Sequence, residues 1–268
     1  MKKIILSLVI LFSSAPLLRA QTFEISAGAN TGIFALHGPG TTANAEIIGG
    51  DQPSNNYVNN PYVNKYAVSY GAFVQPQFVF KSGFIIGLQS SYDILRSSAP
   101  VNTVYPFDVY YAPGYYSESP YQTATGNVTL REQEINLNPY VGYRLKAGNI
   151  NLDIMPGISL GFDLNNREKG SGTIENSHTN YPVDYELDKY PSDVQLKLGA
   201  AANWHKWSLV ASYAYGLTNI SPLRDYSDIV PSYPASSSGA MGDDNDYNIH
   251  SSLFRLGIAY RLFSGKAR

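Results

Sequence analysis

Apolar and polar residues alternate along much of the chain. In the stretch EQEINLNPYVGYRL (residues 132–145), apolar side chains or proline occupy every second position from Ile135 to Leu145. The next stretch, NINLDIMPGISLGFDL (residues 149–164), repeats the pattern from Ile150 to Phe162. Because successive side chains of a β-strand point to opposite faces, a period of two over this length predicts strands with one apolar face and one polar or small face.

The same alternation recurs in six further segments, so that eight strands are predicted. The further segments span residues 23–35, 66–80, 84–95, 194–204, 207–217 and 252–262. Three connections are short turns, and four are long polar segments at about 37–63, 97–127, 165–191 and 218–250. This arrangement is typical of outer-membrane barrels. We therefore predict an all-β, eight-stranded antiparallel transmembrane up-and-down β-barrel with four long extracellular loops and both termini in the periplasm.

A secreted β-sandwich or a soluble barrel would alternate too, but its outward face would be polar. Here the face opposite the apolar one is rich in glycine, serine and alanine, which suits the interior of a narrow barrel. Aromatic residues on the apolar face fall near both ends of the predicted strands, as interfacial side chains do in a bilayer. Near the short turns these are Phe80, Phe84, Tyr143, Trp204, Trp207 and Tyr260, and near the long loops Tyr92, Phe162, Tyr215 and Phe254. The aromatic pattern favours the membrane barrel.

Charged residues of both signs lie on the face that is predicted to point inward. An eight-stranded barrel is just wide enough for side chains to fill it, so a solute pore is not expected. We interpret these charges as ion pairs that plug the lumen and favour one strand register. The candidates are Glu24, Glu134, Arg144, Asp153, Lys197, Arg255 and Arg261, with Asp93 and Asp163 as further acids.

Two prolines fall within predicted strands, where a proline removes one hydrogen bond of the ladder. If Ala147 and Gly148 form the turn, Pro139 and Pro156 face each other across the hairpin on a non-hydrogen-bonded pair. The hairpin ladder then stays whole, and the distortion is expected in the ladders to the two outer neighbours.

The N-terminal residues are typical of a secretory signal peptide. Lys2 and Lys3 precede the apolar run Ile4–Phe12, and cleavage is expected after Ala20, which leaves residues 21–268 as the barrel domain. Cleavage also removes three basic residues, so that 16 basic and 21 acidic residues remain, a net charge of −5 that gives no basic footprint for nucleic acid. The chain has no cysteine, which excludes disulfides, a lipoprotein anchor and thiolate metal sites.

The stretch EINLNPYVGYRLKAGNINLDIMPGISLGFDL resembles the PorT-like outer-membrane β-barrel family of Gram-negative bacteria. The earlier stretch YGAFVQPQFVFKSGFIIGLQSSYD and the closing FRLGIAYRLF are similar to other strands of that family, although SGKAR follows the terminal aromatic Phe263. The resemblance covers about half of the mature chain and implies outer-membrane location and recognition by the barrel assembly machinery. Because some members take part in protein secretion across the outer membrane, it also implies secretion-system proteins as partners.

The second long loop is rich in tyrosine and proline. Tyrosine offers a large amphipathic contact area at a low entropy cost and is enriched in recognition surfaces. We interpret the loop as a contact surface, or as a set of rings that pack together and stiffen the barrel mouth. Its aromatic residues are Tyr105, Phe107, Tyr110, Tyr111, Tyr115, Tyr116 and Tyr121.

Two further groups carry weaker chemical signals. His250 and Ser252 lie two residues apart near the outer leaflet, where a histidine-activated serine oriented by Asp246 or Glu46 would make a lipid A hydrolase. A capping histidine at a strand end is the alternative interpretation. The acidic stretch GDDNDYN (residues 242–248) lacks the full ligand pattern of a calcium loop, so neither a metal nor a cofactor is predicted.

These observations leave three hypotheses. The first is a non-enzymatic barrel that is structural or binds surfaces through its extracellular loops, in contact with outer-membrane lipid and lipopolysaccharide. The second is an accessory component of a secretion or assembly machine, which would use its periplasmic turns as well. The third is the lipid A-modifying hydrolase.

Overall fold

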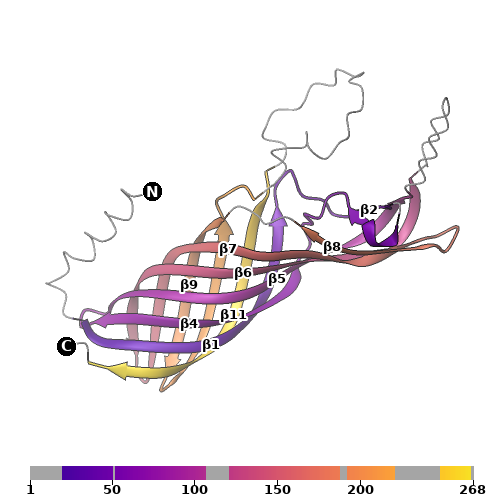
Figure 1. Ribbon diagram of the computed structural model, residues 1–268. Coiled ribbons are helices and arrows are strands. Elements are labelled where there is room, and N and C mark those ends of the chain that lie inside the picture. The colour runs from indigo at the N-terminus through magenta and orange to yellow at the C-terminus, as the bar shows by residue number, and fades with distance from the viewer. Residues whose placement is uncertain (1–19, 51, 107–120, 188–191, 221–247, 267–268) are drawn as a thin grey trace.

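The computed structural model describes residues 20–50, 52–106, 121–187, 192–220 and 248–266. Its described part is all-β apart from one turn of 3₁₀ helix, η1 (Pro53–Asn55), and its eleven strands belong to one sheet (Figure 1). Within these ranges no helix has the length and apolar character needed to cross a membrane. Residues 1–19 of the expected signal peptide lie outside the described residues, and its last residue, Ala20, begins β1.

Eight of the strands form a closed ring, in which each strand pairs antiparallel with two neighbours. In ring order they are β1 (Ala20–His37), β4 (Ala67–Phe80), β5 (Phe84–Tyr105), β6 (Gln122–Ala147), β7 (Ile150–Ile174), β9 (Asp193–Trp204), β10 (Trp207–Gly216) and β11 (His250–Gly265). The pairing of β1 with β11 brings the first and last strands together, as in Phe23 opposite Gly265 and His37 opposite His250. We call the end of the ring that carries the three short turns the turn end.

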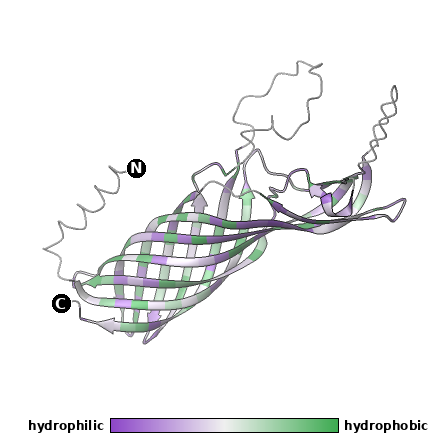
Figure 2. Ribbon diagram, in the orientation of Figure 1, coloured by the Kyte–Doolittle hydropathy of each residue, from purple (hydrophilic) through white to green (hydrophobic). Residues whose placement is uncertain are grey.

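The period-two pattern of the sequence produces a ring that is apolar outside and polar inside. Leu198 on β9 and Ile258 on β11 are each 58% exposed on the outside, whereas Glu24 and Asp153 are at most 3% exposed inside. Figure 2 shows this as alternating colours along the ring strands. Apolar side chains on the outside of a closed ring would be unfavourable in water and are what a bilayer requires.

The hairpin of β6 and β7 differs from the predicted register. Its turn is Gly148–Asn149, one residue later than expected, because glycine takes the positive φ of 62° at the first turn position. Ala147 therefore pairs with Ile150, and Pro139 and Pro156 do not face each other. The prediction of opposed prolines is wrong.

The shifted register also moves the place where the ladder is interrupted. Counting outward from Ala147 and Ile150, Pro139 and Pro156 fall on pairs whose hydrogen bonds belong to the hairpin itself. The regular pairing between β6 and β7 is correspondingly interrupted between Leu137 and Tyr143. The outer ladders are continuous there, since Pro139 pairs with Leu88 and Pro156 with Leu198. The predicted distortion exists, but it lies inside the hairpin.

Three ring strands continue well beyond the ring. β5, β6 and β7 extend on the side away from the turn end, and they are joined there by β2 (Ala45–Ile48), β3 (Tyr57–Val58) and β8 (Asn180–Leu187) (Figure 1). Much of the segments 97–127 and 165–191, which were predicted to be loops, is therefore strand. We call this region the distal lobe: residues 96–105 of β5, 122–131 of β6 and 166–174 of β7, together with β2, β3, β8 and η1.

The distal lobe has an apolar core of its own. β2 pairs with β5 and β3 with β2 on one side, while β8 pairs with β7 on the other. The two edges approach each other, because Asn56 donates to the carbonyl of Pro182 and the backbone N–H of Val58 donates to Glu168. The sheet thus curls around a buried cluster formed by Ala45, Ile47, Val58, Val63, Ala99, Val101, Val104, Ala124, Val128, Ile174 and Val183.

Candidate functional site: the lumen network and the distal lobe

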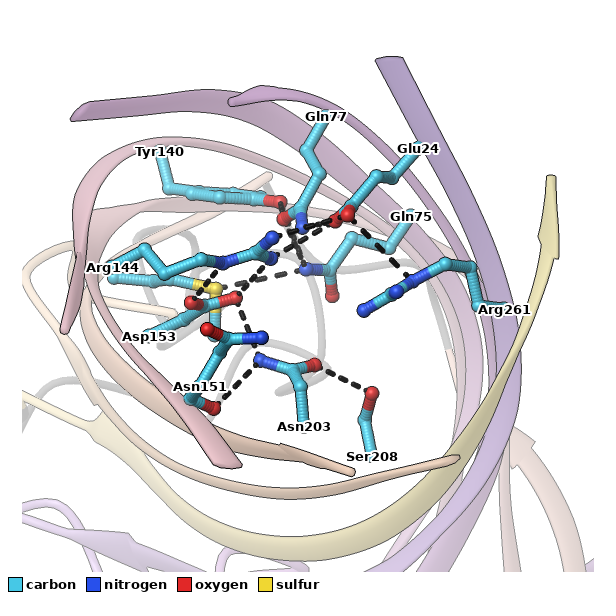
Figure 3. Close-up of polar contacts among 11 residues, drawn as sticks. Glu24, Gln75, Gln77, Tyr140, Arg144, Asn151, Asp153, Asn203, Ser208 and Arg261 are labelled. Carbon is cyan, nitrogen blue, oxygen red and sulfur yellow. Dashed lines mark hydrogen bonds and ion pairs between the residues drawn. The ribbon is translucent and has the colours of Figure 1, made fainter. Parts of the chain in front are cut away.

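The lumen near the turn end holds a buried ion-pair network centred on Arg144 (Figure 3). Its guanidinium donates to both carboxylate oxygens of Glu24 at 3.1 and 2.9 Å and to both of Asp153 at 2.7 and 2.8 Å. Arg261 adds a longer ion pair to Glu24, at 3.7 Å. Bidentate charge-assisted bonds of this kind fix the orientation of both partners. Residues from β1, β6, β7 and β11 are thereby tied across the lumen.

Neutral polar side chains extend this network around the ring. On one side Gln77 donates to Glu24 at 2.7 Å and Tyr140 donates to Gln77 at 2.8 Å. On the other, Asn203 donates to Asp153 at 2.9 Å and accepts from Ser208 at 2.6 Å. Because these groups come from β4, β6, β9 and β10, seven of the eight ring strands meet in one network. A network that spans so many strands specifies their register.

The other predicted lumen charges lie closer to the distal lobe and only partly form ion pairs. Arg255 pairs with Asp93 at 2.8 Å. Lys197 instead donates to the neutral Gln89 at 2.6 Å, and Glu134 accepts from Asn136 at 3.2 Å. Within the described residues no ion pair within 4 Å involves Lys197 or Glu134, and each contacts an amide side chain instead. Amide side chains take the places that the sequence analysis assigned to opposite charges.

Apolar side chains close the remaining lumen at two levels. One cluster, which includes Phe73, Ile85, Tyr140 and Met155, lies beside the Arg144 network. A second lies at the junction with the distal lobe and is formed by Phe34, Leu36, Tyr62, Leu95, Leu130, Ala214, Ile220, Ile249 and Leu253. A cavity of about 20 Å³ lies against the first cluster and is lined among others by Gln75, Gln89, Tyr140 and Lys197, and it is large enough for one water molecule.

The predicted tyrosine surface is described only at its two ends. Tyr105 and Tyr121 come together at the far end of the distal lobe, with ring centroids 5.0 Å apart. Phe107, Tyr110, Tyr111, Tyr115 and Tyr116 lie outside the described residues. The structure adds an aromatic pair that was not predicted from the sequence. The ring centroids of Tyr57 on β3 and Tyr185 on β8 lie 6.2 Å apart, and both side chains are exposed. Only the curling of the sheet brings these two strands together.

The distal lobe also buries one carboxyl group. Glu168 is fully buried, one of its oxygens accepts from Val58 at 3.3 Å, and the other has no hydrogen-bond partner. Burial raises the pKa of Glu168 to about 8, although the bond from Val58 opposes this shift. On the outer face of the lobe, by contrast, Arg167 lowers the pKa of the exposed Asp184. The raised pKa of Glu168 predicts that the stability of the lobe depends on pH.

The residues considered for hydrolysis are not assembled for it. The His250 ring contacts the carbonyl of Thr218 at 3.0 Å, whereas the Ser252 hydroxyl donates to the carbonyl of Ala35 at 3.3 Å. Glu46 lies in the distal lobe, where Asn59 donates to it, and Asp246 lies outside the described residues. Among the described residues no group of three or more metal-binding side chains could hold a metal ion. The acidic stretch 242–248 falls outside that part except for Asn248.

The comparisons with known proteins identify the class of protein. Residues 20–221 match the family described as outer membrane protein beta-barrel domain, and the chain belongs to this family. The all-β fold and the outer-membrane class that the alternation predicted are therefore confirmed. Curated protein sequences gave no match.

Solved structures of two bacterial surface proteins resemble the chain at low identity. One is Ail, the attachment invasion locus protein of Yersinia pestis, which was solved in complex with the heparin analogue sucrose octasulfate. It is 12% identical to this chain, the alignment covers 90% of this chain and 99% of that chain, and the TM-score is 0.30. Neisserial surface protein A is 11% identical, with 90% and 97% covered and a TM-score of 0.33.

Proposed function

We propose that the protein is a non-enzymatic, non-conducting outer-membrane barrel that holds its distal lobe outside the cell as a binding surface. In this proposal the eight ring strands span the membrane, the turn end and both termini lie in the periplasm, and the lobe is extracellular. One observation carries the proposal: β5, β6 and β7 run without a break from a filled ring into a lobe with its own core. Side chains fill the ring, so the lobe is where a partner can bind.

Continuous strands give the lobe a fixed position relative to the membrane. A flexible loop would lose conformational entropy on binding, and a lobe built on the barrel strands avoids much of this cost. The exposed pair Tyr57 and Tyr185 and the ring pair Tyr105 and Tyr121 offer aromatic contact area on it. These features support recognition by the lobe.

Site-specific photo-crosslinking in living cells tests where partners bind. A photoreactive phenylalanine analogue would replace Tyr57 or Tyr185 on the lobe and, as matched controls, Lys81 or Lys146 at the exposed turn end. We expect covalent adducts at the lobe positions and none at the turn end. Adducts at the turn end alone would contradict the proposal and favour the accessory of a secretion or assembly machine, the role suggested by the PorT-like sequence motifs.

Conductance measurements in planar bilayers test the closed lumen separately. The purified wild-type protein is expected to give no stepwise ion conductance, because the Arg144 network and the two apolar clusters fill the ring. Stable channel steps would refute the non-conducting role and leave the crosslinking result to be judged on its own.

A further inference from the structure

An unusual row of arginines crosses the outer face of the molecule at the base of the distal lobe. Arg96 of β5 lies directly opposite Arg131 of β6, and Arg131 lies directly opposite Arg167 of β7. The flanking residues on each strand are buried, so all three side chains point outward. Neighbouring strands are about 4.8 Å apart, and like charges directly opposite each other in a sheet are destabilising.

The protein neutralises this row at one end only. Arg167 forms an ion pair with Asp184 of β8, which also contacts Lys169. Arg96 lies 5.1 Å from the centre of the Tyr70 ring and donates to its hydroxyl at 3.1 Å. Within the described part of the chain, neither Arg96 nor Arg131 forms an ion pair, and no outward-facing residue of β5 or β6 is acidic. The positive charge between β5 and β6 is left for an external anion.

The height of the row on the ring restricts what that anion can be. On the same outer face, Ile94 lies two residues closer to the turn end than Arg96 and pairs with Gln133. Tyr92 lies two residues further in the same direction and pairs with Ile135. Tyr70 and Tyr92 are exposed on this face, and tyrosines gather at the headgroup level of a bilayer. The arginine row is about 13 Å along the strands from Tyr92, immediately above the apolar band. In the orientation proposed above, its guanidinium groups would lie at the headgroup level of the outer leaflet.

We propose that Arg96 and Arg131, beside the ion-paired Arg167, form a binding site for the phosphate groups of a phosphorylated outer-leaflet glycolipid, lipid A. The planar guanidinium group binds phosphate through two parallel hydrogen bonds, and the two arginines without an ion pair match the two phosphates that lipid A carries. The acyl chains of the same molecule would lie against the apolar face below the row. This inference rests on the membrane orientation of the proposed function, with the ring in the membrane and the lobe outside the cell, and not on recognition by the lobe.

Binding of fluorescently labelled lipid A to the folded protein in detergent tests the site. The double variant Arg96→Gln/Arg131→Gln removes the two unpaired charges and keeps the ion pair of Arg167. The control Lys81→Gln/Lys146→Gln removes the same charge at the turn end. We expect the double variant to bind about tenfold or more weakly, since hydrogen bonds to charged groups are among the stronger ones. The control is expected to bind as the wild type does. Heat-modifiable gel mobility verifies that each variant is folded.

Two further ligands, dephosphorylated lipid A and phosphatidylglycerol, test whether the phosphate groups of lipid A are recognised. The wild type should bind dephosphorylated lipid A as weakly as the double variant does, and phosphatidylglycerol should not distinguish the two proteins. Unchanged affinity in the double variant, an equal loss in the lysine control, or full binding of dephosphorylated lipid A would each refute the site. An equal effect on phosphatidylglycerol would refute its assignment to lipid A. None of these results changes the expectations from crosslinking or conductance.

Discussion

The ring and the distal lobe share β5, β6 and β7, and the two faces of these strands have opposite polarity in the two regions. Along β6, the inward positions within the ring are polar, as at Glu134 and Asn136, and the outward ones are apolar, as at Ile135. In the lobe the inward positions are apolar, as at Leu130 and Val128, and the outward ones are polar. The strand keeps its period of two, and only the assignment of faces reverses. In the proposed orientation, the reversal marks the point where the outside of the molecule changes from lipid to water.

The largest expected effect is the difference in stability between losing a buried arginine inside the ring and losing an exposed arginine on the outer face of the lobe. Arg144→Ala leaves Glu24 and Asp153 buried without their shared cation, and breaking a buried pair in this way costs about 3–5 kcal/mol. Arg167→Ala removes an exposed pair with Asp184 and should leave the stability almost unchanged. Urea unfolding in lipid vesicles, followed by the fluorescence of the exposed Trp204 and Trp207, measures both. Equal losses would show that the two environments do not differ.

Truncation of the apolar core tests whether the lobe is independent. Ile47→Ala removes a fully buried side chain of β2 and should destabilise the lobe by about 2–5 kcal/mol. Hydrogen exchange should become faster in β2, β3 and β8 and stay unchanged in β9 and β10. Faster exchange throughout the ring would mean that the ring and the lobe unfold as one unit.

A charge placed outside each region tests the boundary between lipid and water. Ile258→Arg introduces a charge on the lipid-facing side of β11 and should cost about 2–4 kcal/mol. Thr125→Arg introduces the same charge on the exposed outer face of the lobe and should leave the free energy of unfolding unchanged. The same unfolding assay in vesicles compares them, and a neutral Ile258→Arg would count against a spanning β11.

The smallest expected effect is the pH dependence of the lobe. With its pKa raised from 4.5 to about 8, Glu168 binds its proton more tightly in the folded lobe than in the unfolded one. Lobe stability should therefore fall as the pH rises from about 5 to 8, by on the order of 1–3 kcal/mol, and level off above that. Glu168→Gln should abolish this decline. Hydrogen exchange of β3 and β8, corrected for intrinsic rates, measures it. A variant that keeps the wild-type decline would assign the effect to another group.

Part of the site was predictable because charges on an inward face of a narrow ring can only meet one another. Alternation alone predicted Glu24, Arg144 and Asp153 on the inward face, among the other lumen charges, without assigning which acid meets which base. Glu134 and Lys197 contact the amides of Asn136 and Gln89, which alternation could not distinguish from oppositely charged partners. The sequence analysis missed the lobe because it treated polar outward positions, such as Thr125 and Asn127, as signs of a loop.

The sequence by itself determined the eight ring strands, their two faces and the outer-membrane class. These depend on local alternation of apolar and polar residues, which any strand register preserves. The tertiary structure decided which side chains are opposite each other. The turn at Gly148 shifted one register by two residues and moved the proline interruption into the hairpin. The pairing of three neighbouring strands aligned Arg96, Arg131 and Arg167, which are far apart in the sequence. Cross-strand neighbours depend on turn geometry and ring closure, and neither is encoded in the period of a single strand.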